Sequence, residues 1–421
     1  MKKLLITSAM ISILFLCLAM PLHATSFTIL HVFEGGANDG ANPFGDITLS
    51  GSTIYGMTNK GGDTDFGTIF KMEAGNPSSF TLLHEFQAGG DDGKWPQGEL
   101  SLSGSTLYGL TYNGGDGNVG TIFKIETDDP ASFTILHEFA GGANDGSLPW
   151  DSLTLSGSTL YGMTRYGGGS NGGTLFKMEA DNPSSFTLLH EFAGGANDGL
   201  NPEGDVTISG STLYGVTRNG GASDGGTVFK IDVTGNGFTL LHKFLGGADD
   251  GFDPEGSLTL SGSTLYGTTG TGGDLSRGNV FTIDTAGNGF TILHEFEGAQ
   301  SDGQHPTADI TVSGNQLFGT TQLGGFYNKG TVFEMAADDP SSSYTILHDF
   351  AGGANDGTYP YGSLTLSGST LYGMTYVGGD SNKGVIFSMG VEIDEVPEPS
   401  TLLLLLPFLA GLYWIRKRRK K

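Results

Sequence analysis

Short segments of alternating apolar and polar residues recur along the chain, and only its two ends contain long apolar runs. One stretch from residue 98 reads GELSLSGSTLYGLTYNGGDGNVGTIFKIETDDPASFTILHEF, and its alternation and β-branched and aromatic content predict strands at 99–103, 106–111, 120–125 and 133–139. The Gly-Ser pair at 104–105 suits a type II′ turn between the first two strands. The pattern therefore predicts antiparallel units of four strands.

This unit is repeated seven times at intervals of 52 to 54 residues. A recurrent Phe/Tyr-Thr-Ile/Leu-Leu-His segment aligns the copies by its histidine: His31, His84, His137, His190, His242, His294 and His348. Seven such units predict an all-β fold, a seven-bladed β-propeller of four-stranded antiparallel blades. The repeats begin with a fourth strand at 27–33 and end with the other three within 363–389, so we expect the N-terminal strand to complete the last blade. The alternative, a β-helix, usually has shorter coils and needs end caps.

Charge is distributed unevenly between the repeats and the two ends. The chain carries 20 Lys and Arg and 45 Asp and Glu, but eight of the basic residues and none of the acidic ones lie in 1–24 and 401–421. The remaining 12 basic and 45 acidic residues give 25–400 a formal charge of −33, which disfavours nucleic acid as a partner. The single cysteine, Cys17, excludes a disulfide within the chain and a multi-cysteine metal site.

The N-terminal end is typical of a secretory signal peptide. Lys2 and Lys3 precede an apolar stretch, and Ala24 supplies a small residue at the expected cleavage point. We therefore expect residues 1–24 to be removed on export, together with Cys17.

The C-terminal end has three parts. In chain order these are a linker with a Pro-Glu-Pro triplet, an apolar helix and a basic tail: 391–400 with Pro397, Glu398 and Pro399, then 401–415, then 416–421. A helix of 15 residues is about 22 Å long, and basic and aromatic residues at its end can make up the difference from a ~30 Å bilayer core. The basic tail is expected to stay in the cytoplasm.

This trio resembles the PEP-CTERM sorting signal of Gram-negative bacteria. The resemblance implies a transmembrane intermediate in the inner membrane, recognition by an exosortase, cleavage near the triplet and transfer to the cell surface or extracellular matrix. The alternative interpretation is an ordinary tail anchor with a single membrane span.

The body, 25–390, resembles the GloVer tandem repeat of exported bacterial proteins. The matching motif is LYG-x-T-x-x-GG followed by G-T-(I/V/L)-F-K and then LH-x-F, and it extends over about residues 26–389. The resemblance implies a repeat architecture and a surface location, with no assigned reaction.

The repeated histidine shares a strand face with apolar neighbours, because side chains alternate along a strand. We interpret it as a structural residue that packs between blades with one ring nitrogen bonded to a backbone group. A recurrent Gly-Gly-Ala-Asn-Asp-Gly loop supplies one aspartate per repeat: Asp39, Asp92, Asp145, Asp198, Asp250, Asp302 and Asp356. Turn formation is the favoured role for these carboxylates, and a Ca²⁺ site in each blade is the alternative. No other cofactor is expected.

Departures from the repeat consensus gather in loops expected on one face of the ring. Aromatic and basic side chains are prominent there: Phe44, Trp95, Tyr112, Trp150, Arg165, Tyr166, Arg218, Phe252, Tyr359 and Tyr361. Trp95 and Trp150 stand in equivalent loops of adjacent repeats. Such a face can bind sugars, which stack on aromatic rings and bond to polar side chains. The alternative is that the aromatics fill gaps over the blades.

Three functions remain open at this point. The favoured one is a non-catalytic surface protein that binds a glycan or exopolysaccharide through the aromatic face. The others are a structural matrix component without a small ligand and a polysaccharide hydrolase or lyase. The chain has no Gly-x-Ser-x-Gly elbow, no His-Glu-x-x-His motif and no phosphate-binding loop before a helix, so we expect it not to be an enzyme.

Overall fold

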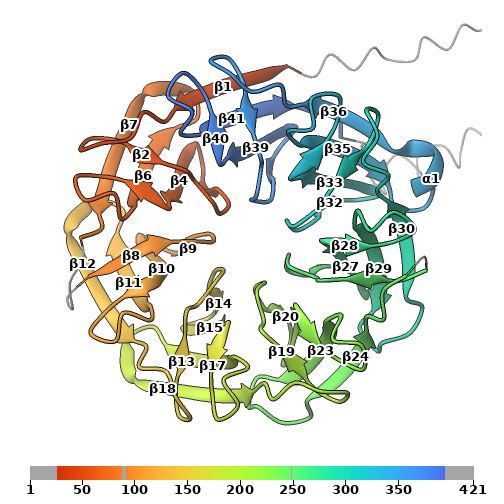
Figure 1. Ribbon diagram of the computed structural model, residues 1–421. Coiled ribbons are helices and arrows are strands. Elements are labelled where there is room, and N and C mark those ends of the chain that lie inside the picture. The colour runs from red at the N-terminus through yellow and green to blue at the C-terminus, as the bar shows by residue number, and fades with distance from the viewer. Residues whose placement is uncertain (1–25, 88–91, 248, 394–421) are drawn as a thin grey trace, which may run out of the picture.

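Seven β-sheets are arranged like blades around a central axis in the computed structural model of the protein (Figure 1). The structure describes residues 26–87, 92–247 and 249–393. The expected signal peptide, the Pro-Glu-Pro triplet, the apolar segment and the basic tail lie outside these residues. Among the described residues, no helix is long and apolar enough to cross a membrane.

Each blade has four antiparallel strands, and its first strand lies nearest the axis (Figure 1). The first strands are β3 (Thr48–Ser50), β9 (Ser101–Ser103), β14 (Thr154–Ser156), β20 (Thr207–Ser209), β26 (Thr259–Ser261), β32 (Thr311–Ser313) and β38 (Thr365–Ser367). The second strands are β4 (Thr53–Thr58), β10 (Thr106–Gly114), β15 (Thr159–Thr164), β21 (Thr212–Thr217), β27 (Thr264–Thr269), β33 (Gln316–Thr321) and β39 (Thr370–Thr375). We number the blades 1 to 7 in this order.

The third and fourth strands complete each blade toward the rim. The third strands are β6 (Thr68–Glu73), β11 (Thr121–Glu126), β17 (Thr174–Glu179), β23 (Thr227–Asp232), β29 (Asn279–Asp284), β35 (Thr331–Ala336) and β41 (Val385–Gly390). The fourth strands of blades 1 to 6 are β7 (Asn76–Glu85), β12 (Asp129–Glu138), β18 (Asn182–Glu191), β24 (Thr239–Lys243), β30 (Thr291–Glu295) and β36 (Thr345–Asp349). In blade 7, β1 (Phe27–Val32) pairs antiparallel with β41 in a sheet ordered β1-β41-β39-β38.

Short strands that the alternation pattern did not predict join the two loops on one face of each blade. Twelve of them form six two-stranded pairs: β2 (Gly40–Ala41) with β5 (Lys60–Gly61), β13 (Gly146–Ser147) with β16 (Tyr166–Gly167), β19 (Gly199–Leu200) with β22 (Asn219–Gly220), β25 (Gly251–Phe252) with β28 (Thr271–Gly272), β31 (Gly303–Gln304) with β34 (Leu323–Gly324) and β37 (Gly357–Thr358) with β40 (Val377–Gly378). In blade 2, β8 (Gly93–Pro96) pairs with the end of β10. The helix α1 (Pro340–Ser343) lies in the connection before β36. The short pairs hold the loops of this face together.

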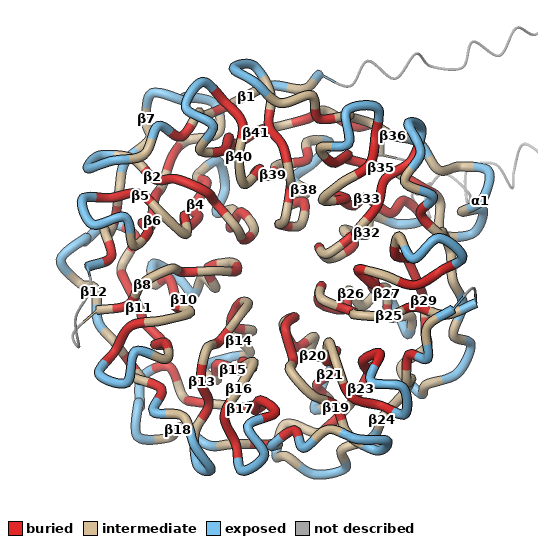
Figure 2. The backbone as a smooth tube through the Cα atoms, viewed as in Figure 1, coloured by how far each residue is buried: buried red, intermediate tan, exposed pale blue. Residues whose placement is uncertain are grey.

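The hydrophobic core lies between blades, and Figure 2 shows buried residues concentrated within the ring and exposed ones on the rim loops. It consists of seven clusters, each filled from two neighbouring blades. One cluster, for example, packs Ile122 and Phe139 of blade 2 against Leu160 and Phe176 of blade 3. Each blade is therefore stabilised mainly by its neighbours.

Glycines of the repeat motif have specific steric roles. Gly104 has a φ of 62° at the first position of the predicted β9–β10 turn. Gly109 is paired across the sheet with Phe123, and a Cβ atom on Gly109 would lie 2.5 Å from Cζ of that ring. The glycine thus makes room for a phenylalanine of its own blade.

Candidate functional site

The loop that returns from the rim to the axis in each blade contains a proline, and the residue before this proline has a left-handed backbone. These residues are Asn42, Trp95, Leu148, Asn201, Asp253, His305 and Tyr359, with φ between 54° and 56°. Their amides donate hydrogen bonds to the preceding blade; Trp95 N, for example, lies 2.7 Å from Phe66 O. The left-handed conformation is unfavourable for a side chain as large as Trp95, so these bonds and the proline hold each loop in one shape.

The residue after the same proline lies near the propeller axis. Six of these seven residues line a cavity of about 250 Å³: Phe44, Trp150, Glu203, Glu255, Thr307 and Tyr361. All seven blades contribute to its lining, which places the cavity on the axis. Arg218, from the loop after β21, completes its charged side.

One side of the cavity is aromatic. The rings of Phe44 and Tyr361 stack with their centroids 4.8 Å apart, and Phe44 meets Trp150 edge to face at 5.9 Å. Tyr112 supports Trp150 from behind at 5.4 Å, and Tyr376 contacts Tyr361 at 5.3 Å. These contacts fix the orientation of the rings before any ligand arrives.

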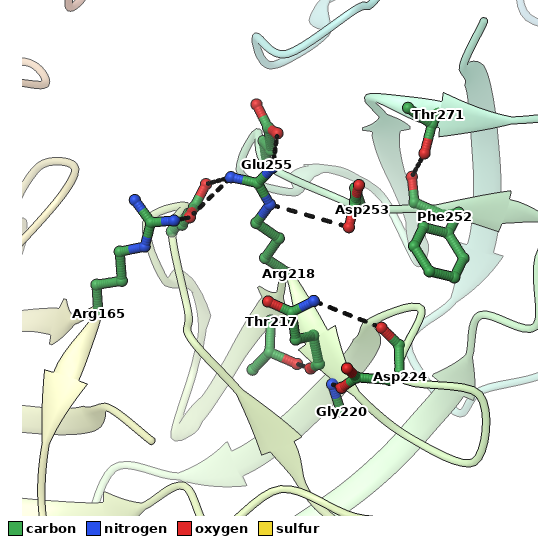
Figure 3. A network of polar contacts seen from close by, with 11 residues as sticks. Arg165, Thr217, Arg218, Gly220, Asp224, Phe252, Asp253, Glu255 and Thr271 are labelled. Atoms are coloured by element: carbon green, nitrogen blue, oxygen red, sulfur yellow. Dashed lines mark hydrogen bonds and ion pairs between the residues drawn. The ribbon is translucent and has the colours of Figure 1, made fainter. Parts of the chain in front are cut away.

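The other side is a network of charges in which the buried Glu203 pairs with the partly exposed Arg165 and Arg218. Figure 3 shows Arg165, Arg218, Asp253 and Glu255 of this network. The Glu203 carboxylate has 1% of its side-chain surface exposed, and its Oε1 lies 3.0 Å from Arg165 and 3.3 Å from Arg218. Arg218 also reaches Glu255 at 3.3 Å and Asp253 at 3.9 Å. Two guanidinium groups are thus shared by three carboxylates.

Burial sets the protonation of this network. It raises the pKa of Glu203, against the opposing effect of the two arginines, and it raises the pKa of Glu255 to about 7, with a further contribution from the neighbouring Glu203. The Arg165 guanidinium also lies over the Trp150 ring, 4.7 Å from its centroid. The charged and aromatic sides are therefore joined through Arg165.

A ring of acidic and serine side chains surrounds the axis next to the cavity. Its members, which we call the axial ring, stand three residues after each loop proline: Asp46, Glu99, Ser152, Asp205, Ser257, Asp309 and Ser363. Six hydrogen bonds run from the backbone amide of one member to the side chain of the next: Glu99 to Ser152 (2.5 Å), Ser152 to Asp205 (2.6 Å), Asp205 to Ser257 (2.6 Å), Ser257 to Asp309 (2.5 Å), Asp309 to Ser363 (2.8 Å) and Ser363 to Asp46 (2.5 Å). The ring connects all seven blades.

The carboxyl groups of the axial ring and of the adjacent Asp151 have raised pKa values. Burial raises the pKa of Asp205 to about 7, and burial together with the neighbouring carboxylates raises the pKa values of Glu99, Asp151 and Asp309 well above their usual range. Burial also raises the pKa of Asp46. Three of these residues, Asp46, Asp151 and Asp309, line the cavity.

The residues expected at a ligand face fall into three groups. Phe44, Trp150, Arg218 and Tyr361 line the cavity, and Tyr112 and Arg165 support Trp150. The remaining expected residues, away from the cavity lining, are Trp95, Tyr166, Phe252 and Tyr359. The two tryptophans stand in equivalent loops, but Trp95 precedes its proline and packs 6.3 Å from Phe66, whereas Trp150 follows its proline.

The carboxylates of the axial ring were not predicted from the sequence. Their signal was a single column of the repeats, three positions after the proline, which reads Asp, Glu, Ser, Asp, Ser, Asp, Ser through the seven copies. In a propeller the first strand of each blade lies nearest the axis. An acidic residue just before that strand could therefore have been predicted to lie close to the axis.

The repeated histidine packs between blades, but its hydrogen bond goes to a carboxylate, which corrects the expectation of a backbone partner. Nε2 of each histidine lies 3.0 to 3.1 Å from Oδ1 of the loop aspartate eight residues later. Its ring stacks on an aromatic ring of the adjoining blade, as His137 does on Phe186 at 3.9 Å. The histidine thus joins a loop to a neighbouring blade.

The loop aspartates are engaged in turn hydrogen bonds. In blade 2, Asp145 accepts from His137 and from the amides of Ala140 and Gly146 at 2.8 Å each. Within the described parts of the chain, no three His, Cys, Asp or Glu residues are grouped closely enough to hold a metal ion. This geometry supports the turn interpretation of these carboxylates.

Seven blades around an axial cavity define a β-propeller built from tandem repeats. The chain belongs to the Gloeobacter/Verrucomicrobia repeat family, whose model matches residues 18–225 and 205–395. This match confirms the resemblance of the repeats. Comparison with curated proteins gives no match.

Comparison with solved structures finds similar chains at low identity. A chain of a nidogen/laminin complex is 14% identical, with 72% of this chain and 93% of that one covered and a TM-score of 0.42. A puromycin-hydrolysing peptidase of Mycobacterium tuberculosis is 11% identical, with 86% and 58% covered and a TM-score of 0.48. TolB of Acinetobacter baumannii is 13% identical, with 81% of each chain covered and a TM-score of 0.39. Likenesses at this level say nothing about function.

Proposed function

We propose that the protein is a non-catalytic, exported propeller that binds a saccharide unit in its axial cavity. The observation that carries this proposal is the two-sided lining of the cavity. Phe44, Trp150 and Tyr361 offer apolar ring faces, while Glu203, Glu255 and Arg218 offer hydrogen-bond partners. Sugars have apolar C–H faces and hydroxyl rims, and pockets that recognise such ligands combine aromatic walls with a few fixed polar groups.

The size of the cavity favours a single sugar unit. At about 250 Å³ it is smaller than the roughly 300–1,000 Å³ typical of pockets for drug-sized ligands. We propose that one residue or branch of a longer glycan enters from the loop face while the rest of the polymer stays outside.

The proposed location follows from the two ends of the sequence. The N-terminal signal and the Pro397-Glu398-Pro399 segment support export, sorting by an exosortase and display at the cell surface or in the extracellular matrix. Replacing the triplet with Ala-Ala-Ala is expected to keep the protein in the inner membrane. Cell fractionation and immunoblotting measure this, and unchanged release to the surface would contradict the sorting proposal.

A glycan array with the full chain in detergent tests the binding proposal. Trp150→Ala removes an aromatic wall of the cavity and is expected to lower binding at least tenfold. Trp95→Asn is the matched control, because Trp95 is outside the cavity lining and Asn occupies the equivalent left-handed position at Asn42 and Asn201. Equal binding by both variants and the parent would refute the cavity as the site.

A further inference from the structure

We propose that the axial cavity selects a sugar that carries a free ammonium group, which Asp46, Asp151 and Asp309 hold beside the aromatic wall. This inference rests on the proposed saccharide-binding function and names the chemical class of the ligand. It draws on three features of the cavity: the balance of its charges, the partners of its carboxylates and the nature of its walls.

The charge of the cavity lining is strongly unbalanced. Five carboxylates line it (Asp46, Asp151, Glu203, Glu255 and Asp309), against the single guanidinium of Arg218. That guanidinium is already bound by Glu203 and Glu255, each at 3.3 Å. Among the described residues, no ion pair involves the other three carboxylates. A cationic ligand would supply the missing positive charge.

The hydrogen bonds to these three carboxylates come from neutral donors. Asp46 and Asp309 accept from the backbone amides of Ser363 and Ser257, both at 2.5 Å, and Asp151 accepts from the hydroxyl of Ser152 at 3.1 Å. Such bonds orient the carboxyl groups but supply no positive charge to their ionised forms. The Thr307 hydroxyl, also in the lining, has no partner among the described residues and offers one more contact to a polar ligand.

The walls favour an organic cation over a metal ion. Phe44, Trp150 and Tyr361 line the cavity with aromatic rings, which attract ammonium groups and apolar C–H bonds but supply no metal ligand other than the tyrosine hydroxyl. Among the described residues, no group of three or more His, Cys, Asp or Glu side chains could hold a metal ion. An amino sugar fits both sides, because its ring meets the aromatics while its ammonium meets the carboxylates.

Proton linkage gives this proposal a signature. The groups that face the ammonium are Asp46, Asp151 and Asp309, with Glu99 and Asp205 next to them in the axial ring and Glu203, Glu255 and Arg218 across the cavity. Burial raises the pKa values of all these carboxylates, so part of the ring holds protons near neutral pH. A bound ammonium favours their ionised forms, and binding should therefore release protons.

Isothermal titration of the full chain at pH 7 with glucosamine, N-acetylglucosamine and glucose tests the proposal. We expect glucosamine to bind at least tenfold more tightly than the two neutral sugars and to release protons, measured from the heat in buffers of different ionisation enthalpy. Asp309→Asn keeps the acceptor for Ser257 but removes the charge, and it should abolish most of this preference without weakening the neutral sugars. The matched control is Asp116→Asn, which removes an exposed carboxylate outside the cavity lining, in a loop bonded to Glu138 of the outer strand β12.

The outcomes distinguish the two proposals. Equal binding of all three sugars would overturn the ammonium preference and leave the saccharide site standing, whereas no binding of any sugar or glycan would remove both. If a divalent ion binds these carboxylates and prevents glucosamine from binding, the site is a metal site, and the inference is overturned. A thermal melt of each variant verifies that it is folded.

Discussion

Neutralising one carboxylate of the axial ring should stabilise the protein in a pH-dependent way. Asp205 suits this test because it belongs to the ring but not to the cavity lining. Asp205→Asn preserves a side-chain oxygen that can accept from the Ser152 amide, whose donor lies 2.6 Å away in the parent. The substitution therefore changes the charge with little change in shape.

The raised pKa determines the sign and size of the effect. The pKa of Asp205 is about 7 in the folded chain against 3.8 for the free side chain, so the folded state binds the proton more tightly. The parent is therefore expected to lose stability as pH rises from about 4 through 7, and the variant is not subject to that loss. From pH 5 to pH 8 the parent crosses about two pH units in which only the folded state holds this proton. Its free energy of unfolding therefore falls by about 3 kcal/mol as an upper limit. Asp205 is only partly buried, and solvent screening reduces the effect of its charge, so we expect about 1–2 kcal/mol.

Urea unfolding of the parent, Asp205→Asn and the control Asp116→Asn at pH 5 and pH 8 measures this difference. We expect Asp205→Asn to raise the free energy of unfolding at pH 8 and to do so much less at pH 5, while the exposed control changes it by less than about 0.5 kcal/mol at both. An advantage of equal size at the two pH values, or a loss of stability at pH 8, would refute the reasoning.

Three further predictions concern the repeat. Asp145→Ala removes the acceptor for His137 and for two backbone amides and should lower the free energy of unfolding by about 1–3 kcal/mol, measured by urea unfolding; no change would contradict a structural role. Gly56→Ala places a Cβ atom 2.6 Å from Cζ of Phe70 and should lower the midpoint of thermal unfolding by several degrees. Gly75→Ala is the control, because no atom lies within 4 Å of the added Cβ, and it should leave the midpoint unchanged. Equal midpoints for the two variants would contradict the steric account. Titration with millimolar Ca²⁺ should give no saturable heat, because the loop aspartates are engaged in turn hydrogen bonds; seven saturable sites per chain would restore the calcium interpretation.

The blades could be predicted because their signal is local and repeated. The alternation of apolar and polar residues predicted the strands in 99–139 to within a few residues, although the fourth strand begins four residues earlier, at Asp129. The short strand pairs were missed because two residues around a Gly-Gly sequence have no alternation to detect. The partner of each histidine could have been found, since the aspartate eight residues later is equally constant in all seven copies.

The cavity was harder to predict because convergence on an axis is a property of the closed ring. Phe44 and Tyr361 are far apart in sequence and stack only because blades 1 and 7 are neighbours. Trp95 and Trp150 looked equivalent because each is next to a loop proline. Trp95 precedes its proline and packs against Phe66, whereas Trp150 follows its proline and lines the cavity. Aligning the loops on the proline would have separated the two positions.

The most direct test of the central claim, that a sugar occupies the axial cavity, is a fluorescence titration with Trp150 as the only tryptophan. The chain has three tryptophans, and Trp95→Asn with Trp414→Phe leaves Trp150 alone. We predict a saturable change in emission as glucosamine is added, with the same dissociation constant as in calorimetry, since the ring lines the cavity. Heat of binding with no change in Trp150 emission would place the sugar elsewhere and contradict the account.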